Sequence, residues 1–220
     1  MDTVPKVTVP GLAPDSAPTR LLLLRHAEVE DRYHRKFGGR IDMCLSPRGQ
    51  TQALTLAGYL KLTRLDALYV SPMKRARQTM EPIAATTALT PSVVPDLREV
   101  DFGDWTGLSW TEVAERFRAS AFDWLHRLED ASIPNGESAS SFRLRVEPCL
   151  LNILQSHPGQ TVAVVCHGGV IRMMLSILLR LPLPATGSFE IEYASLTRLL
   201  HRLTRTEIDV LNFTPWRDMQ

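Results

Sequence analysis

Four short polar clusters in the chain contain the residue types that phosphoryl chemistry needs. They are Arg25-His26-Ala27-Glu28, Ser71-Pro72-Met73-Lys74-Arg75, Arg98-Glu99 and Cys166-His167-Gly168-Gly169. Arginine presents paired N–H donors that match the oxygens of a phosphate. A neutral imidazole can attack phosphorus, and a nearby carboxylic acid can protonate the leaving oxygen and then activate a water molecule. Together the clusters predict phosphoryl transfer through a phosphohistidine.

Such a site needs no metal ion, because arginine and histidine side chains can stabilise the charge on the phosphoryl oxygens. Backbone N–H groups at the Gly168-Gly169 turn would also favour an anion. We therefore expect no metal and no cofactor. Each residue has an ordinary alternative: His26 could be a polar residue that ends a strand, and Arg25 and Arg75 could pair with nearby acids. The coincidence of all the clusters favours catalysis.

Strands and helices in alternation must position these clusters. Short apolar runs predict buried strands at residues 21–24, 67–70, 92–94 and 161–166. Serine followed by proline is typical of a helix start and occurs at Ser46-Pro47 and Ser71-Pro72. The expected helices cover residues 47–62, a segment from 72 onward, 109–128, 137–156 and 168–180. This alternation predicts an α/β fold, a three-layer α/β/α sandwich around a mostly parallel sheet.

Ligands of an open parallel sheet bind beyond the carboxyl ends of its strands, so the clusters should meet at one rim. The C-terminal part of the chain alternates apolar and polar residues. It predicts short strands or hairpins at 189–193, 196–203 and 207–211. Residues 1–19 contain four prolines among small residues and predict a flexible leader, which leaves 20–220 as a single catalytic domain.

Composition excludes several classes of protein. The 220 residues include 25 Lys+Arg and 24 Asp+Glu, a net charge of +1, which argues against a nucleic-acid partner. The apolar run at 170–183 is interrupted by two arginines and is too short to cross a bilayer, so no membrane partner is expected. Three separated cysteines without a paired motif indicate a reducing compartment, and hence a cytoplasmic protein.

The motifs resemble, in order and over roughly residues 20–213, those of the histidine phosphatase superfamily, which has the phosphoglycerate-mutase-like fold. The matching stretches are Leu-Leu-Arg-His-Ala-Glu (23–28), Leu-Ser-Pro-Arg-Gly-Gln (45–50), Val-Ser-Pro-Met-Lys-Arg-Ala-Arg-Gln-Thr (70–79), Leu-Arg-Glu-Val-Asp-Phe-Gly-Asp-Trp-Thr-Gly (97–107), Asn-Gly-Glu-Ser (135–138) and Val-Cys-His-Gly-Gly-Val-Ile-Arg (165–172). The Phe-Gly-Gly-Arg-Ile-Asp stretch (37–42) and the Asn-Gly-Glu-Ser element look most like the α-ribazole-phosphatase and broad-specificity branch.

The resemblance assigns a role to each matching residue. It implies that His26 is the phosphorylated nucleophile and that Glu99 is the general acid and base. It implies that His167 donates to the phosphoryl oxygens, and that Arg25 and Arg75 clamp the phosphate. These roles agree with the chemistry expected from the residue types alone.

Three further positions bear on phosphate binding. The resemblance implies that a backbone N–H of Gly39 lies near the phosphate. Ala27 stands where the family usually has glycine, a change that is tolerated if the backbone φ is negative. Arg32 stands where the family often has asparagine. This replacement either removes one auxiliary phosphate contact or adds a cation that favours a more anionic substrate, so Arg32 is a candidate phosphate-binding residue.

Hydrolysis is the activity that the resemblance favours. Related mutases carry a longer insertion after the glutamate, whereas Glu99 here leads directly toward a helix near Ser109, which should admit water. We expect a metal-independent phosphatase for a small phosphomonoester, either α-ribazole-phosphate-like or broad in specificity. A phosphoglycerate-type mutase and a non-catalytic phosphate-binding domain are alternatives, and the oligomeric state stays open.

A cysteine-dependent phosphatase is a third alternative. Cys166 and Arg172 are separated by five residues, as in enzymes whose thiolate attacks phosphorus. Val165 and Met173, however, stand where that class has histidine and a hydroxyl residue. This alternative also leaves the Arg25-His26 cluster without a role, so a buried structural thiol is the better interpretation of Cys166.

Overall fold

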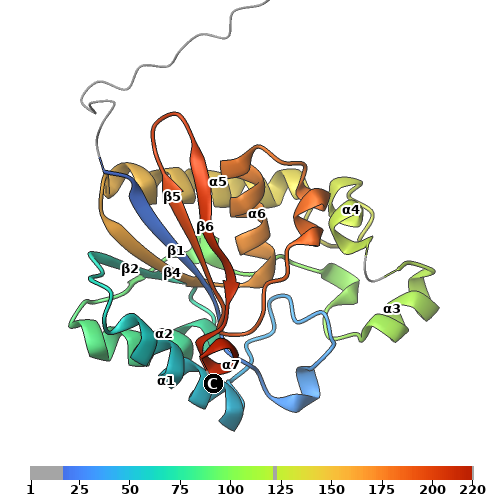
Figure 1. The fold of residues 1–220 in the computed structure, drawn as a ribbon. Coiled ribbons are helices and arrows are strands. Elements are labelled where there is room, and N and C mark those ends of the chain that lie inside the picture. The colour runs from blue at the N-terminus through green and yellow to red at the C-terminus, as the bar shows by residue number, and fades with distance from the viewer. Residues whose placement is uncertain (1–16, 121–122, 220) are drawn as a thin grey trace, which may run out of the picture.

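A single sheet forms the centre of the computed structural model, which describes residues 17–120 and 123–219. Most of the predicted leader, residues 1–16, lies outside the described residues. The strands are β1 (Thr19–Arg25), β2 (Ala67–Val70), β3 (Ser92–Val93), β4 (Thr161–Cys166), β5 (Leu196–His201) and β6 (Thr206–Phe213). Their order is β3-β2-β4-β1-β5-β6; the first four strands are parallel, and β5 is antiparallel to both of its neighbours, β1 and β6. The predicted mostly parallel sheet is confirmed (Figure 1).

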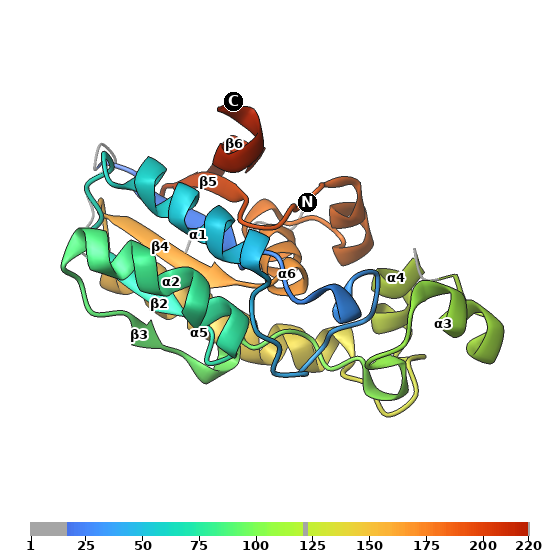
Figure 2. The same ribbon diagram turned by 90° about the horizontal axis from the view of Figure 1, so that it is seen from below.

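Helices cover both faces of the sheet (Figures 1 and 2). They are α1 (Pro47–Leu60), α2 (Lys74–Thr87), α3 (Trp110–Phe117), α4 (Trp124–Glu129), α5 (Ala139–Ser156), α6 (Gly168–Leu179) and α7 (Pro215–Asp218). α1 and α2 pack together on one face, and α5 and α6 on the other, as predicted for a three-layer sandwich. α3 and α4 extend past the carboxyl ends of the strands (Figure 1). No helix in the described part of the chain is long and apolar enough to cross a membrane.

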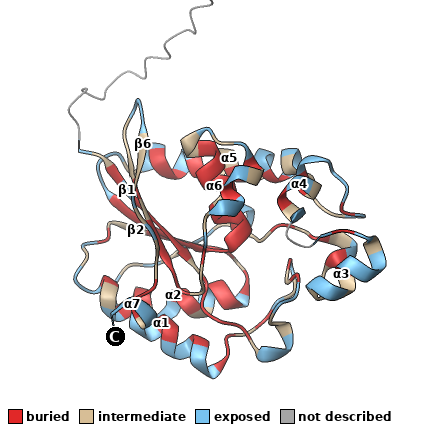
Figure 3. Ribbon diagram, turned by 45° about the vertical axis from the view of Figure 1, so that its right-hand side comes forward, coloured by how far each residue is buried: buried red, intermediate tan, exposed pale blue. Residues whose placement is uncertain are grey.

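Burial of β1 on both faces explains its continuous apolar run (Figure 3). Leu21 and Leu23 pack into the core beneath α5 and α6, while Leu22 and Leu24 pack into the core beneath α1 and α2. All four are at most 2% exposed. A strand in the middle of a parallel sheet is expected to be apolar on both sides. The buried strand β1 therefore holds the residues that follow Leu24 in a fixed position.

The two serine-proline pairs behave differently. Ser46 caps α1 as predicted, since its side chain accepts a hydrogen bond from the N–H of Gly49. The same prediction is wrong for Ser71, because α2 begins three residues later with Met73 as its N-cap. The Ser71 hydroxyl lies instead 2.8 Å from the ring of His167. A tertiary contact has replaced the local cap.

The predicted helix over 109–128 is also wrong, because the structure divides it into α3 and α4. Arg118 follows α3 in the left-handed conformation, with φ of 49°. A residue in this conformation cannot continue an α-helix. Val113 of α3 and Leu125 of α4 are nevertheless buried in the same core, so the two short helices are held together by packing rather than by a continuous helix.

Residues 189–193 form no strand, contrary to prediction. The carbonyl oxygens of Phe189 and Ile191 accept hydrogen bonds from the guanidinium groups of Arg172 and Arg25, at 2.9 and 2.6 Å. These backbone acceptors are thus used by arginine side chains rather than by a neighbouring strand. The strands predicted at 196–203 and 207–211 are confirmed as β5 and β6.

Candidate active site

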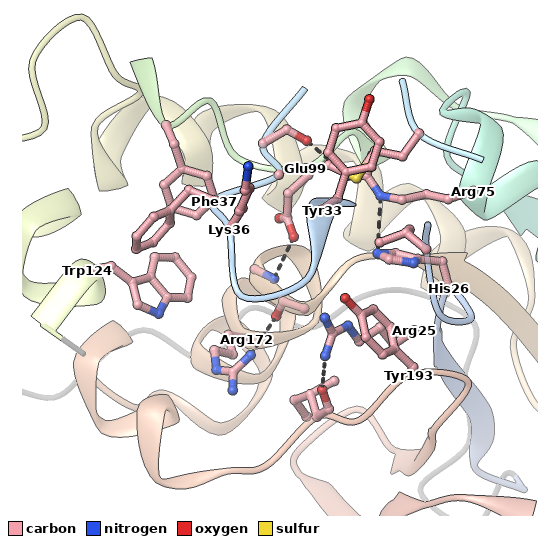
Figure 4. Close-up of a pocket in the computed structure, with 18 of the residues that line it drawn as sticks. Arg25, His26, Tyr33, Lys36, Phe37, Arg75, Glu99, Trp124, Arg172 and Tyr193 are labelled. Atoms are coloured by element: carbon pink, nitrogen blue, oxygen red, sulfur yellow. Dashed lines mark hydrogen bonds between the residues drawn. The ribbon is translucent and has the colours of Figure 1, made fainter. Parts of the chain in front are cut away.

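One pocket at the carboxyl edge of the sheet collects five of the seven predicted site residues (Figure 4). They are Arg25, His26, Gly39, Arg75 and Glu99. The pocket has a volume of about 260 Å³. It is further lined by two cations and by aromatic side chains, namely Lys36, Arg172, Tyr33, Phe37, Phe102, Trp110, Trp124 and Tyr193. This volume is at the small end for ligand pockets, which suits a small molecule with an anionic group.

Two hydrogen bonds fix His26 directly after β1. Its backbone N–H donates to the carbonyl of Cys166 on β4 (3.0 Å), and its ring Nδ1 lies 2.8 Å from the carbonyl oxygen of Ala27. Because a carbonyl oxygen can only accept, Nδ1 carries the ring proton and Nε2 keeps its lone pair. Burial, followed by the charges of Arg75 and Arg25, lowers the pKa of His26 well below its ordinary value. His26 is therefore a neutral imidazole whose Nε2 is unprotonated.

Arg75 lies beside this Nε2 atom. Its Nε donates to His26 Nε2 (3.2 Å), its Nη1 to the carbonyl of Ile41 (2.7 Å) and its Nη2 to the carbonyl of Gly39 (2.9 Å). The residue is only 2% exposed, and burial lowers the pKa of its guanidinium to about 10, so it is cationic at neutral pH. A phosphoryl group on Nε2 would therefore meet a positive charge that the protein already holds in place.

Arg25 and Arg172 add two further guanidinium groups to the pocket. Arg25 lies 4.1 Å over the ring of Tyr193, and both arginines donate to carbonyls of the 189–193 segment. The Nε atom of each is buried without a protein partner, and no described carboxylate forms an ion pair with either. Both are therefore available to an anion. Arg172 was not among the predicted site residues, although its position four residues after Gly168 places both on one face of α6.

Glu99 is held at the start of α6. Its Oε1 accepts from the N–H of Val100 (2.9 Å), and its Oε2 accepts from the N–H of Gly169 (3.2 Å). A Cβ atom at Gly169 would overlap the Glu99 carboxylate, so a side chain at that position would displace the carboxylate from its place. Figure 4 shows the carboxylate among the polar groups that point into the pocket. An acid placed there can reach the leaving oxygen of a bound phosphomonoester.

Arg145 of α5 anchors the loop that carries Glu99. It donates to the backbone carbonyls of Asp96, Arg98 and Glu99, at 2.6, 2.8 and 3.1 Å. It also forms a two-bonded ion pair with Glu137, at 2.7 and 2.9 Å. The two side chains are only 12% and 8% exposed. Glu137 belongs to the Asn-Gly-Glu-Ser motif, so this motif acts on the site by holding Arg145 against the Glu99 loop.

His167 lies behind the nucleophile. It follows β4 directly, it is fully buried, and its ring centroid is 5.1 Å from that of His26. Burial, followed by the charge of Arg75, lowers the pKa of His167 well below its ordinary value. Its Nε2 contacts Ser71, whereas its Nδ1 is buried without a protein partner.

Arg32 lies outside the pocket. Its guanidinium pairs with Glu30 at 3.0 Å and lies 4.7 Å from the ring of Tyr33, and its side chain is 69% exposed. These contacts give no support to a phosphate-binding role for Arg32. Ala27 has no positive φ, so the backbone accepts alanine there without strain.

The geometry favours neither a thiolate nor a metal at this pocket. Cys166 is fully buried at the end of β4, and burial raises the pKa of its thiol. Among the described residues, the group that brings three possible metal ligands together is Glu28, Asp31 and His34, within 4.8 Å. Its Glu28 already accepts a hydrogen bond from Ser46, and none of the three lines the pocket.

The chain is similar to known phosphatases over most of its length. The model of the histidine phosphatase superfamily (branch 1) matches residues 21–214. Phosphoserine phosphatase 1 of Hydrogenobacter thermophilus is 34% identical over 195 residues, which is 89% of this chain and 92% of that protein. The adenosylcobalamin/alpha-ribazole phosphatase of Escherichia coli is 28% identical over 177 residues, 79% of this chain and 85% of that protein.

Solved structures show the same relationship. A mycobacterial glucosyl-3-phosphoglycerate phosphatase superposes with a TM-score of 0.78 at 28% identity, over 88% of this chain and 98% of that one. The resemblance expected from the motifs is confirmed in both sequence and fold. The chain belongs to the histidine phosphatase superfamily.

Proposed function

We propose that this protein is a metal-independent phosphatase that hydrolyses a small phosphomonoester through a phosphohistidine at His26. The observation that carries the proposal is the arrangement around Nε2 of His26. A neutral imidazole with its lone pair on Nε2 lies against the guanidinium of Arg75, and its proton is held on the opposite nitrogen. Arg25 and Arg172 supply further unpaired N–H donors in the same pocket. This arrangement suits an attack on a dianionic phosphoryl group.

The reaction would proceed in two balanced steps. In the first, the Nε2 lone pair of His26 forms a bond to phosphorus, the bond from phosphorus to the ester oxygen breaks, and Glu99 gives its proton to the leaving alkoxide. In the second, Glu99 takes a proton from water, the water oxygen bonds to phosphorus, and the bond from phosphorus to Nε2 breaks. Arg25, Arg75 and a donor from His167 hold the phosphoryl oxygens in both steps.

Access of water to the phosphohistidine favours hydrolysis over transfer to a second substrate. From Glu99 to the start of α3 at Trp110, the chain makes a single short 3₁₀ turn (Gly103–Trp105) and carries no long insertion. We propose a small phosphomonoester as substrate, α-ribazole-phosphate-like or from a broader set. The relatives named above as phosphoserine and glucosyl-3-phosphoglycerate phosphatases widen that set to phosphate esters that carry a carboxylate. Lys36 is the cation of this pocket that the phosphoryl group does not use, and we propose that it binds such a carboxylate.

We also propose that the enzyme works in the cytoplasm. Cys44, Cys149 and Cys166 are all free thiols in the structure. A reducing compartment keeps such thiols from oxidising. The proposed partners are small phosphorylated molecules, in keeping with a pocket of about 260 Å³ and a net charge of +1.

Mapping of the phosphorylated residue tests the mechanism. The enzyme is mixed with an aryl phosphate in the presence of a chelator, quenched in alkali to preserve phosphohistidine, and analysed by mass spectrometry. We expect phosphate on His26. Phosphate on Cys166 would instead show the thiolate mechanism. Absence of both the adduct and phosphate release, across aryl and alkyl esters, would indicate a binding domain.

Replacing Cys166 with alanine is expected to leave most of the activity, because the thiol is buried and its raised pKa keeps it protonated. Loss of the sulfur atom from a packed core should reduce the free energy of unfolding by about 1 kcal/mol. Steady-state hydrolysis and thermal unfolding measure the two effects. Cys149→Ala on α5 is the matched control: it removes a thiol at a position away from the pocket and should leave the activity unchanged. A folded Cys166→Ala protein without activity would contradict the proposal.

His26 and His167 are expected to stay neutral in the ligand-free folded protein at pH values where an unperturbed imidazole takes up a proton, because burial lowers both pKa values. In urea the same residues should titrate at about 6.5. Below that pH the unfolded chain takes up protons that the folded chain does not, so the free energy of unfolding should decrease as the pH falls. An NMR titration of ring carbon-bound protons measures this, and a folded-state midpoint near 6.5 would count against it.

A further inference from the structure

Ser71 and His167 form a fully buried pair beside the nucleophile. Both residues are 0% exposed, and Ser71 Oγ lies 2.8 Å from His167 Nε2. The other ring nitrogen of His167, Nδ1, is buried and has no protein partner. A buried polar atom without a partner is rare in folded proteins, and one beside a nucleophile is a candidate for a contact made during the reaction. The function proposed above supplies the partner, a phosphoryl oxygen.

The hydrogen bonds of Ser71 decide which ring nitrogen is protonated. Its oxygen is the acceptor for the N–H of Met73 (3.4 Å), and its one proton can then be donated. The acceptor within reach of that proton is Nε2 of His167. If Nε2 carried the proton instead, the buried hydroxyl would have no acceptor. The hydroxyl therefore donates, and Nε2 accepts.

The position of Ser71 is well fixed. It follows β2 directly, and its backbone N–H donates to the carbonyl of Val165 on β4 (3.0 Å). His167 begins its own helix from the end of the same strand β4. The hydroxyl and the imidazole are therefore carried by adjacent strands of one parallel sheet, and their separation does not depend on a loop.

We propose that Ser71 is a positioning residue that fixes the tautomer of His167, so that Nδ1 carries the proton and offers it to a phosphoryl oxygen. This proposal rests on the phosphatase function proposed above. It gives the two histidines the same tautomer but opposite roles: His26, whose Nδ1–H faces a carbonyl oxygen, attacks with the lone pair of Nε2, whereas His167 donates the proton of Nδ1. With Nε2 protonated, His167 would turn a lone pair toward an anion and repel it.

The tautomer can be measured without any substrate. In protein labelled with ¹⁵N-histidine, long-range ¹H–¹⁵N correlation spectra distinguish a protonated ring nitrogen from one with a lone pair. We expect Nδ1 of His167 to be protonated in the unmodified protein and the Nε2–H form to become populated in Ser71→Ala. A protonated Nε2 in the unmodified protein would overturn the proposal, whether or not the variant folds.

Kinetics test the consequence for catalysis. Ser71→Ala is expected to lower kcat/KM for an aryl phosphate by about ten- to a hundredfold, as for loss of one oriented donor to a developing anion. In a His167→Ala background the same change should cost less than about twofold, because Ser71 would act through His167 alone. An equal loss in both backgrounds would show a merely structural role and overturn the proposal.

Ser195→Ala is the matched control. Ser195 is 1% exposed, and its hydroxyl is buried without a partner, so this change removes a buried hydroxyl without changing a hydrogen bond. It should leave the His167 tautomer and kcat/KM unchanged. The two measurements test different claims. Absence of phosphate on His26 in the mass spectra rejects the proposed function, whereas a proton on Nε2 of His167 in the NMR spectra rejects the role of Ser71.

Discussion

Replacement of His26 with alanine is expected to lower phosphate release by about four orders of magnitude or more and to abolish the covalent phosphoenzyme. The reason is that His26 supplies the one imidazole that lines the pocket of the described chain. The other polar side chains there are arginines, a lysine, tyrosines, tryptophans and Glu99, none of which has an imidazole nitrogen to attack phosphorus. Phosphate release from an aryl ester and mass spectrometry after alkaline quenching measure both effects.

Phosphate binding separates loss of the nucleophile from loss of the fold. His26→Ala should still bind inorganic phosphate, because Arg25, Arg75 and Arg172 remain in the pocket. His126→Ala, which makes the same change at an exposed position of α4, is the control and should keep full activity. Near-native turnover by a folded His26→Ala protein would falsify the phosphohistidine mechanism.

Strand ends explain how much of the site could be predicted from the sequence. His26 and His167 directly follow β1 and β4, whose strongly apolar runs make the strands easy to recognise. In a parallel sheet, adjacent strands end at the same edge, so residues that follow them must converge. Arg75 and Glu99 could be placed at the same rim because each lies shortly after a recognisable strand. The positions of these residues therefore followed from local patterns combined with one rule of topology.

Contacts between distant segments explain what the sequence could not reveal. The sequence around Ser71 is typical of a helix cap. Its hydroxyl contacts His167 because β2 and β4 are neighbours in the sheet, which the local sequence does not reveal. Arg145 lies in the middle of a helical pattern, and its role depends on α5 lying against the Glu99 loop. The 189–193 segment has an alternating pattern typical of a strand, yet arginine side chains take its carbonyls. The sequence pattern of a segment does not show that distant side chains will bind the carbonyl oxygens that a neighbouring strand would otherwise use.

Glu99→Gln is expected to reduce kcat/KM for alkyl phosphates by about a hundred- to ten-thousandfold and to affect the first step with an activated aryl phosphate much less. Glutamine keeps nearly the same shape but cannot give a proton to the leaving oxygen. An alkoxide needs that proton, whereas a good aryl leaving group does not. Because the amide also cannot take a proton from water, the second step should be slow for every substrate. The aryl ester should therefore produce a burst and an accumulated phosphohistidine.

The difference between alkyl and aryl esters distinguishes proton transfer by Glu99 from a structural role, because Glu99 also makes a structural contact. Its carboxylate accepts from the N–H of Gly169, and loss of that contact alone would disturb the start of α6 and slow all substrates by the same factor. Glu137→Gln provides the matched control, since it weakens the Arg145 anchor behind the same loop without touching the proposed proton donor. We expect this control to slow aryl and alkyl esters equally. Equal losses in Glu99→Gln, without a burst, would show that Glu99 holds the loop and transfers no proton.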